Sequence, residues 1–114
     1  MEDVRLKTAH FEFQGRVYEL RCNFNVLAEI EAEAGSLRSF LRLSTMKSVL
    51  IALAAMLNDY ADDMGWEERI SSKELGRVLA TERRKIKQVS NMVVELVLDA
   101  LRSPAAADGG VEKN

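Results

Sequence analysis

The stretch from Ser44 to Tyr60 constrains this chain most, because it reads STMKSVLIALAAMLNDY and is apolar almost all the way round a helix. One helical stripe carries Met46, Val49, Leu50, Leu53, Met56, Leu57 and Tyr60, and the remainder is largely Ile51, Ala52, Ala54 and Ala55. A helix with this pattern has to be covered by other elements on most sides. It is too short and too interrupted to span a bilayer. The stretch therefore predicts a buried central helix.

Polar residues predict where this helix begins and ends. The hydroxyl of Ser44 or Thr45 can accept a hydrogen bond from an otherwise unpaired backbone N–H in the first turn. Asn58, Asp59 and Asp62 mark the return to water. The run ADDMGWEERI after Tyr60 is therefore predicted to be a loop.

Residues 4–24 alternate between apolar and polar side chains, which predicts a β-hairpin that turns at Gln14-Gly15. Its apolar face is predicted to comprise Phe11, Phe13, Tyr18, Leu20, Cys22 and Phe24. The side chains between them then face water. An isolated hairpin is marginal in water, so helices are expected to cover the apolar face.

Capping residues divide the rest of the chain into further helices. Asn25 is predicted to cap a helix over residues 26–34, which Gly35 ends in a left-handed conformation. Ser36 is predicted to cap a short helix over residues 37–43.

The second half of the chain carries two more helix signals. Ser71 and Glu74 match a capping box for a helix that continues through about Ala80. Thr81 is predicted to cap the last helix. The inward positions of that helix are predicted to be Ile86, Val89, Met92, Val93, Leu96, Val97, Ala100 and Leu101.

Together these elements predict an α+β, mainly α fold, in which an N-terminal β-hairpin packs on a bundle of four to five helices. One domain over residues 1–102 is expected, because a chain of 114 residues supports a single hydrophobic core. Pro104 is expected to stop the last helix, and residues 103–114 lack any periodicity. They are predicted to form a disordered tail.

Composition narrows the function classes. Apolar residues make up 47% of the chain and the net charge is -2, so neither general disorder nor a broad attraction to nucleic acid or membranes is expected. The single cysteine, Cys22, cannot form an internal disulfide. The first residues resemble no signal peptide. A cytoplasmic location in a bacterial cell is the expectation.

No arrangement of residues predicts catalysis, a metal site or a cofactor. His10 is the only histidine, and Cys22 has no base near it in sequence. The carboxylates of Glu29, Glu31 and Glu33 are expected to diverge on their helix. Asp59, Asp62 and Asp63 lack the spacing of a calcium loop, and a solvated helix exit is the preferred interpretation.

A basic cluster formed by Arg83, Arg84, Lys85 and Lys87 is the one feature that favours phosphate. No aromatic residues interleave with it, and its charges also suit the polar face of an amphipathic helix. Contact with nucleic acid through this cluster is retained as an alternative.

Four residues are candidates for binding a protein partner: Met56, Met64, Trp66 and Met92. Methionine side chains repack at low cost, which suits a surface that receives a partner helix. Trp66 stands in a polar segment where no repeat requires its burial. It either staples that segment to the bundle or anchors an interface, and both alternatives stay open.

The order of these elements resembles the small tail assembly chaperones of long-tailed bacteriophages, prophages and gene transfer agents. The resemblance covers about residues 8–101. It rests on the hairpin HFEFQGRVYELRCNF, the segment FNVLAEIEAEAG, the entry of Ser44, Thr45 and Met46 into IALAAMLNDY, and the late SSKELGRVLA.

This resemblance implies a protein without enzymatic residues that binds the tape measure protein and keeps it soluble during tail assembly. The tail tube protein is a further candidate partner, and self-association into a homo-oligomer is left open. The rival hypotheses are a small adaptor or regulatory protein that contacts nucleic acid through Arg83 to Lys87, and, ranked last, an enzyme subunit.

Overall fold

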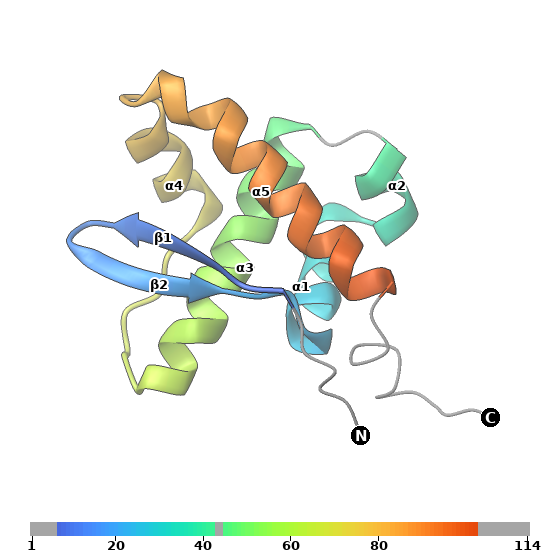
Figure 1. The fold of residues 1–114 in the computed structure, drawn as a ribbon, viewed down its shortest axis with the longest axis horizontal. Coiled ribbons are helices and arrows are strands. Elements are labelled where there is room, and N and C mark those ends of the chain that lie inside the picture. The colour runs from blue at the N-terminus through green and yellow to red at the C-terminus, as the bar shows by residue number, and fades with distance from the viewer. Residues whose placement is uncertain (1–6, 43–44, 103–114) are drawn as a thin grey trace.

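The computed structural model describes residues 7–42 and 45–102, in which a two-stranded antiparallel hairpin precedes five helices (Figure 1). The elements are β1 (Ala9–Phe13), β2 (Arg16–Leu20), α1 (Phe24–Ala34), α2 (Leu37–Arg42), α3 (Met46–Met64), α4 (Ser72–Leu79) and α5 (Arg83–Arg102). The predicted α+β, mainly α fold is confirmed. The predicted tail and Ser44 lie outside the described residues.

The hairpin turns where the sequence predicts, at Gln14-Gly15. Phe13 pairs with Arg16, and both turn residues have positive φ, 51° for Gln14 and 82° for Gly15. A two-residue turn of this hand matches the twist of the strands. The second strand ends earlier than predicted, at Leu20, because the chain bends there to enter α1.

The bend changes the cap of α1. The Val26 N–H donates to the side chain of Asn23 at 3.0 Å, so Asn23 is the N-cap and the prediction of Asn25 was wrong. Phe24 therefore begins a helix, where it is exposed, and does not extend the apolar face of the strand. Gly35 does end α1, with φ 92° and an extended ψ in place of the predicted left-handed conformation. Ser36 caps α2 as predicted, accepting from the Ser39 N–H.

The central helix α3 is capped by Thr45, whose hydroxyl accepts a hydrogen bond from the Ser48 N–H at 3.1 Å. It continues to Met64, one turn beyond the predicted exit, so residues 61–64 are helical and the predicted loop was too long. Asp62 and Asp63 are exposed positions of this last turn. The helix stops at Gly65, which takes the left-handed conformation.

Two backbone hydrogen bonds close the end of α3. Gly65 N–H donates to the carbonyl of Asp62, and Trp66 N–H donates to that of Ala61, at 3.2 and 2.9 Å. This 6→1 and 5→2 pair is a Schellman motif. It sets the direction in which the chain, and with it Trp66, leaves the helix.

The caps of the last two helices differ from each other. Ser71 accepts from the Glu74 N–H at 3.0 Å and caps α4 as predicted. The hydroxyl of Thr81 instead donates back to the Val78 carbonyl at 2.7 Å, so it closes the end of α4 and does not cap α5.

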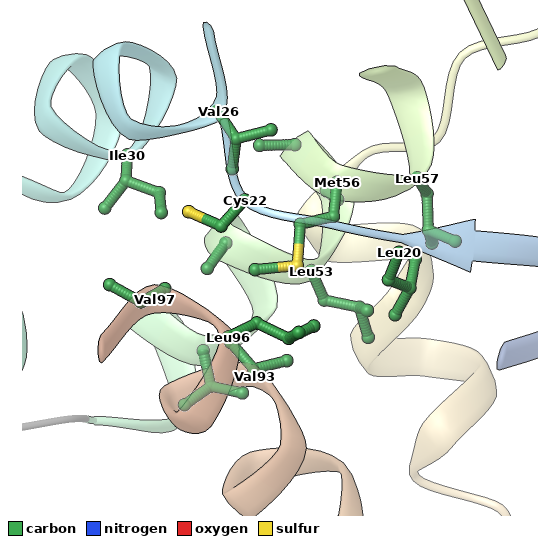
Figure 2. Packing of buried hydrophobic residues seen from close by; sticks show 14 of the residues in the cluster. Leu20, Cys22, Val26, Ile30, Leu53, Met56, Leu57, Val93, Leu96 and Val97 are labelled. Atoms are coloured by element: carbon green, nitrogen blue, oxygen red, sulfur yellow. The ribbon is translucent and has the colours of Figure 1, made fainter. Parts of the chain in front are cut away.

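The core forms where α3 meets the hairpin, α1, α4 and α5 (Figure 1). Figure 2 shows side chains from β2, the segment after it, α1 and α5 converging on those of α3; the labelled residues are Leu20, Cys22, Val26, Ile30, Leu53, Met56, Leu57, Val93, Leu96 and Val97. Two predicted inward residues are exposed: Met46 lies in the first turn of α3 and Leu101 in the last turn of α5, where neighbouring elements no longer cover them.

Lys7 joins the start of the described chain to its last helix. Its backbone N–H donates to Asp99 Oδ2 at 2.9 Å, and its ammonium lies 3.3 Å from the carboxylate of Glu95. Both partners belong to α5. The segment before β1 and the C-terminal helix therefore lie side by side.

Candidate functional site

A groove between α1 and α3 is a feature of the described surface that could receive a partner. It has a volume of about 460 Å³ and is bounded at one side by the segment that links α3 to α4. Its lining comprises Asn25, Val26, Glu29, Glu33, Ile51, Ala54, Ala55, Asn58, Asp59, Asp62, Arg69, Ile70, Ser71 and Ser72.

The floor of the groove is the second face of the central helix. Ile51, Ala54 and Ala55 remain 7–8% exposed, whereas Leu53 and Leu57 on the core face are 0% exposed. The all-round apolar pattern thus serves two surfaces, one closed by the rest of the fold and one that still reaches the groove. Alanine side chains are short, so Ala54 and Ala55 leave room that a larger side chain would fill.

Carboxylates dominate the rim. Four of them, Glu29, Glu33, Asp59 and Asp62, line the groove with a single guanidinium, that of Arg69. Glu29 and Glu33 are four residues apart, so they share one face of α1. The prediction that the glutamates diverge was therefore wrong for this pair, although Glu31 does not line the groove.

The two sides of the rim differ in how their charges are satisfied. Asp62 pairs with Arg69, and Asp59 accepts from the Asn23 side-chain amide at 2.9 Å and lies 3.2 Å from the guanidinium of Arg21. Glu29 and Glu33 have no ion-pair partner among residues 7–42 and 45–102. Within the described ranges, the α1 side of the groove therefore presents two carboxylates without a counter-charge.

Asn58 holds the linker side of the groove in place. Its side-chain amide donates to the Ile70 carbonyl and its oxygen accepts from the Ile70 N–H, both at 2.9 Å. These paired bonds satisfy both backbone groups of Ile70 and hold that residue against α3. The sequence places Asn58 only at the exit of the helix, because nothing local to it indicates a partner twelve residues away.

A network beside the groove ties the end of the hairpin to α3. Arg21 pairs with Asp63 as well as with Asp59, and the hydrogen bond with Asp63 is the main cause that raises the pKa of Arg21. Asn23 bridges the same network to the first turn of α1. The acidic residues of the last turns of α3 thus position β2 and α1, and their structural role explains their clustering.

Trp66 packs into an aromatic cluster on the hairpin side of α3. Its ring lies edge-to-face with Tyr18 and Tyr60, at centroid distances of 5.5 and 5.8 Å. The guanidinium of Arg16 lies 4.2 Å above the indole, and Glu68 pairs with Arg16 at 3.2 Å. The geometry favours the staple interpretation of Trp66, because three side chains from two other elements cover it.

The remaining partner-binding candidates do not form one surface with Trp66. Met56 is 1% exposed and lies in the core, so a partner cannot reach its side chain on the folded surface. Met92 is partly buried on α5, packed against the core. Met64 is 49% exposed and remains accessible.

The other candidates of sequence analysis also have defined places. Cys22 is buried, and burial raises the pKa of its thiol from 9.0 to about 12, which disfavours the nucleophilic thiolate. His10 is exposed on β1. Among the described residues no group of three or more His, Cys, Asp or Glu side chains could hold a metal ion.

The basic cluster lies at the start of α5 and contributes no residue to the lining of the groove. Arg83, Arg84 and Lys87 are exposed, and Lys85 pairs with Glu82 at 3.0 Å.

None of the helices within the described ranges has the length and apolarity needed to cross a membrane. Comparison with protein-family models, with curated proteins and with solved structures gives no match for this chain.

Proposed function

We propose that this protein is a non-enzymatic tail assembly chaperone that acts in the cytoplasm of a bacterial cell, binding the tape measure protein and keeping it soluble. The observation that carries the proposal is the groove between α1 and α3, which joins an apolar floor to a charged rim. The resemblance of residues 8–101 to small tail assembly chaperones supplies the identity of the partner.

The physical basis is the chemistry of a long, apolar-rich helical partner. Before the tail tube surrounds it, such a protein exposes amphipathic helices whose apolar stripes drive aggregation. A groove between two helices can cover one such stripe by helix-in-groove packing. Several copies of this protein bound along one partner would together hold it in solution, while each single contact stays weak enough to release.

Co-expression with a tape measure protein tests the proposal. We expect the tape measure protein to move from the pellet to the soluble fraction and to co-purify with this chain. Ala54→Phe, which fills the groove floor, is the test variant. Its matched control is Ala32→Phe on the exposed face of α1. Solubility that is the same with and without this chain would overturn the proposal.

The basic cluster supports one alternative function, contact with nucleic acid by an adaptor or regulatory protein. Arg83 and Arg84 stand in the first turn of α5, where the helix dipole already disfavours positive charge. A phosphate there would relieve that repulsion. Retardation of DNA or RNA that decreases with salt and is lost in Arg83→Glu/Arg84→Glu would support this alternative over the chaperone.

A further inference from the structure

We propose that the groove selects a cationic amphipathic helix, in which Lys or Arg residues one turn apart flank a narrow stripe of apolar side chains. The inference rests on the proposed function for the identity of the partner, and it adds the chemistry of the segment that binds.

The α1 side of the groove carries negative charge. Glu29 and Glu33 are exposed on one face of α1 and line the groove without an ion-pair partner in the described parts of the chain. Two like charges one turn apart repel each other on an isolated helix. A partner with two cations at the same spacing would satisfy both carboxylates and remove that repulsion.

The walls of the groove have the length and shape to receive a short helix. The lining residues of α3 run from Ile51 to Asp62, a length of roughly 16 Å at 1.5 Å per residue, and those of α1 run from Asn25 to Glu33. Both walls are helices whose backbone hydrogen bonds are made internally, so they offer no edge to which a strand could pair. A helix of two to three turns fits walls of this length.

The floor of the groove determines what kind of apolar stripe the partner helix needs. Ile51, Ala54, Ala55 and Ile70 each expose only 7–8% of their surface, so the apolar strip is narrow. Asn58 fixes Ile70 against α3, which keeps the strip in place before a partner arrives. A narrow, pre-formed strip favours a partner with one row of apolar side chains over a broadly apolar one.

A second copy of this chain fits the groove less well. The basic start of α5 has the required charge, but Val89, Val93 and Leu96, which follow it on the helix, are buried in the core of their own molecule. In the first turn of α5, Ile86 is only partly exposed. The basic cluster could therefore pair with the rim but would leave the floor uncovered.

Three labelled peptides of about 20 residues test the proposal, since shorter isolated helices are marginal in water. The first carries a single apolar stripe flanked by lysines, the second has glutamate in place of each lysine, and the third has the composition of the first in an order without a stripe. Fluorescence anisotropy against the whole chain gives each affinity. We expect measurable binding of the first peptide only.

Charge reversal in the rim provides the matched comparison. Glu29→Lys/Glu33→Lys should weaken binding of the lysine peptide about tenfold or more at low salt, because two attractions become repulsions. Glu31→Lys, on the same helix but outside the groove, should change it less than about twofold. The difference should shrink near 1 M salt, where screening acts over about 3 Å. Unfolding midpoints of all variants would show that each still folds.

Several results would overturn the inference. These are equal binding of the glutamate peptide or of the peptide without a stripe, equal effects of the double variant and Glu31→Lys, and self-association of the chain that the double variant abolishes. The tape measure experiment separates this failure from that of the proposed function. If Glu29→Lys/Glu33→Lys still keeps the tape measure protein soluble, the function stands and the charge selection fails. If the peptides behave as expected and that protein stays insoluble, the reverse holds.

Discussion

Leu53 illustrates how one buried side chain reports on the core. It is 0% exposed on the core face of α3, and Figure 2 shows it between side chains of α5 and β2. Leu53→Ala should lower the free energy of unfolding by about 2 to 5 kcal/mol, since it removes buried methyl groups and leaves a cavity. Leu101→Ala, at an exposed position, should change it by less than about 0.5 kcal/mol. Urea denaturation of both variants checks this, and equal midpoints would contradict the core assignment.

Trp66 has two possible roles that predict opposite effects of its truncation. As an interface anchor, it would lose partner affinity on truncation and cost little stability; as a staple, it would do the opposite. Its contacts with Tyr18, Tyr60 and Arg16 lead us to expect that Trp66→Ala lowers the free energy of unfolding by about 2 kcal/mol or more.

Trp66→Phe is the matched variant, because it keeps a ring in the cluster and should retain most of the stability. Thermal unfolding, read beside the solubility of the tape measure protein, distinguishes the two roles. A variant Trp66→Ala that unfolds like the parent and no longer keeps that protein soluble would restore the interface interpretation.

The hairpin turn carries a prediction at the scale of an element. Gln14 has φ 51° and is exposed, and a left-handed conformation costs a residue such as glutamine about 1 kcal/mol. Asparagine tolerates this conformation and is preferred at this turn position. Gln14→Asn should therefore raise stability by up to about 1 kcal/mol, or a few degrees in Tm.

Gln14→Ala is the control for that variant. It removes the amide without supplying the left-handed preference, so its Tm should not exceed that of the parent. Differential scanning calorimetry on the three proteins decides the matter. A gain of equal size in both variants would mean that loss of the glutamine side chain, and not the backbone conformation, is responsible.

Elements also show what could be predicted from the sequence. Period and caps identified each of the helices and strands, because Thr45, Ser36 and Ser71 act through backbone groups only three residues away. The start of α1 was predicted wrongly because its cap also has a distant partner. Asn23 caps α1 while also bonding Asp59, and neither contact favours it over Asn25 in the sequence alone.

The groove could be predicted only in part for the same reason. The spacing of Glu29 and Glu33 places both on one face of a helix, and this signal was available in the sequence. Their facing wall comes from Ile51 to Asp62, and which face of an all-apolar helix stays open depends on how α5, the hairpin and α1 divide it. Tertiary packing determines that division.

At the scale of the whole molecule, the thiol of Cys22 reports on opening of the fold. It is 1% exposed, and its pKa is raised from 9.0 to about 12, first by burial and then by the charges of Asp59 and Asp99. Because the pKa of the thiol is higher in the folded state, it stabilises that state at pH values below the pKa of the thiol in the unfolded chain. This stability should be present below about pH 9 and be lost as the pH rises toward 12.

Two measurements check this behaviour. Labelling of the thiol at pH 8 should be slow in the native protein and become fast in urea at the unfolding midpoint seen by circular dichroism. Between pH 9 and 12 the parent should lose more stability than Cys22→Ala, which lacks the titrating group. Rapid labelling of the native protein, or equal pH dependence in the two proteins, would contradict the buried, neutral thiol.

The contact of Lys7 with Asp99 has a consequence for how the protein is made. On a ribosome the hairpin emerges before α5, yet the partners of Lys7 in the described part of the chain, Asp99 and Glu95, both belong to α5. Until then the nascent chain carries α3 with the face that α5 will cover still open to water. Folding of this domain therefore completes only after α5 has emerged, and a message cut short before residue 83 should yield an aggregating fragment, not a smaller working domain.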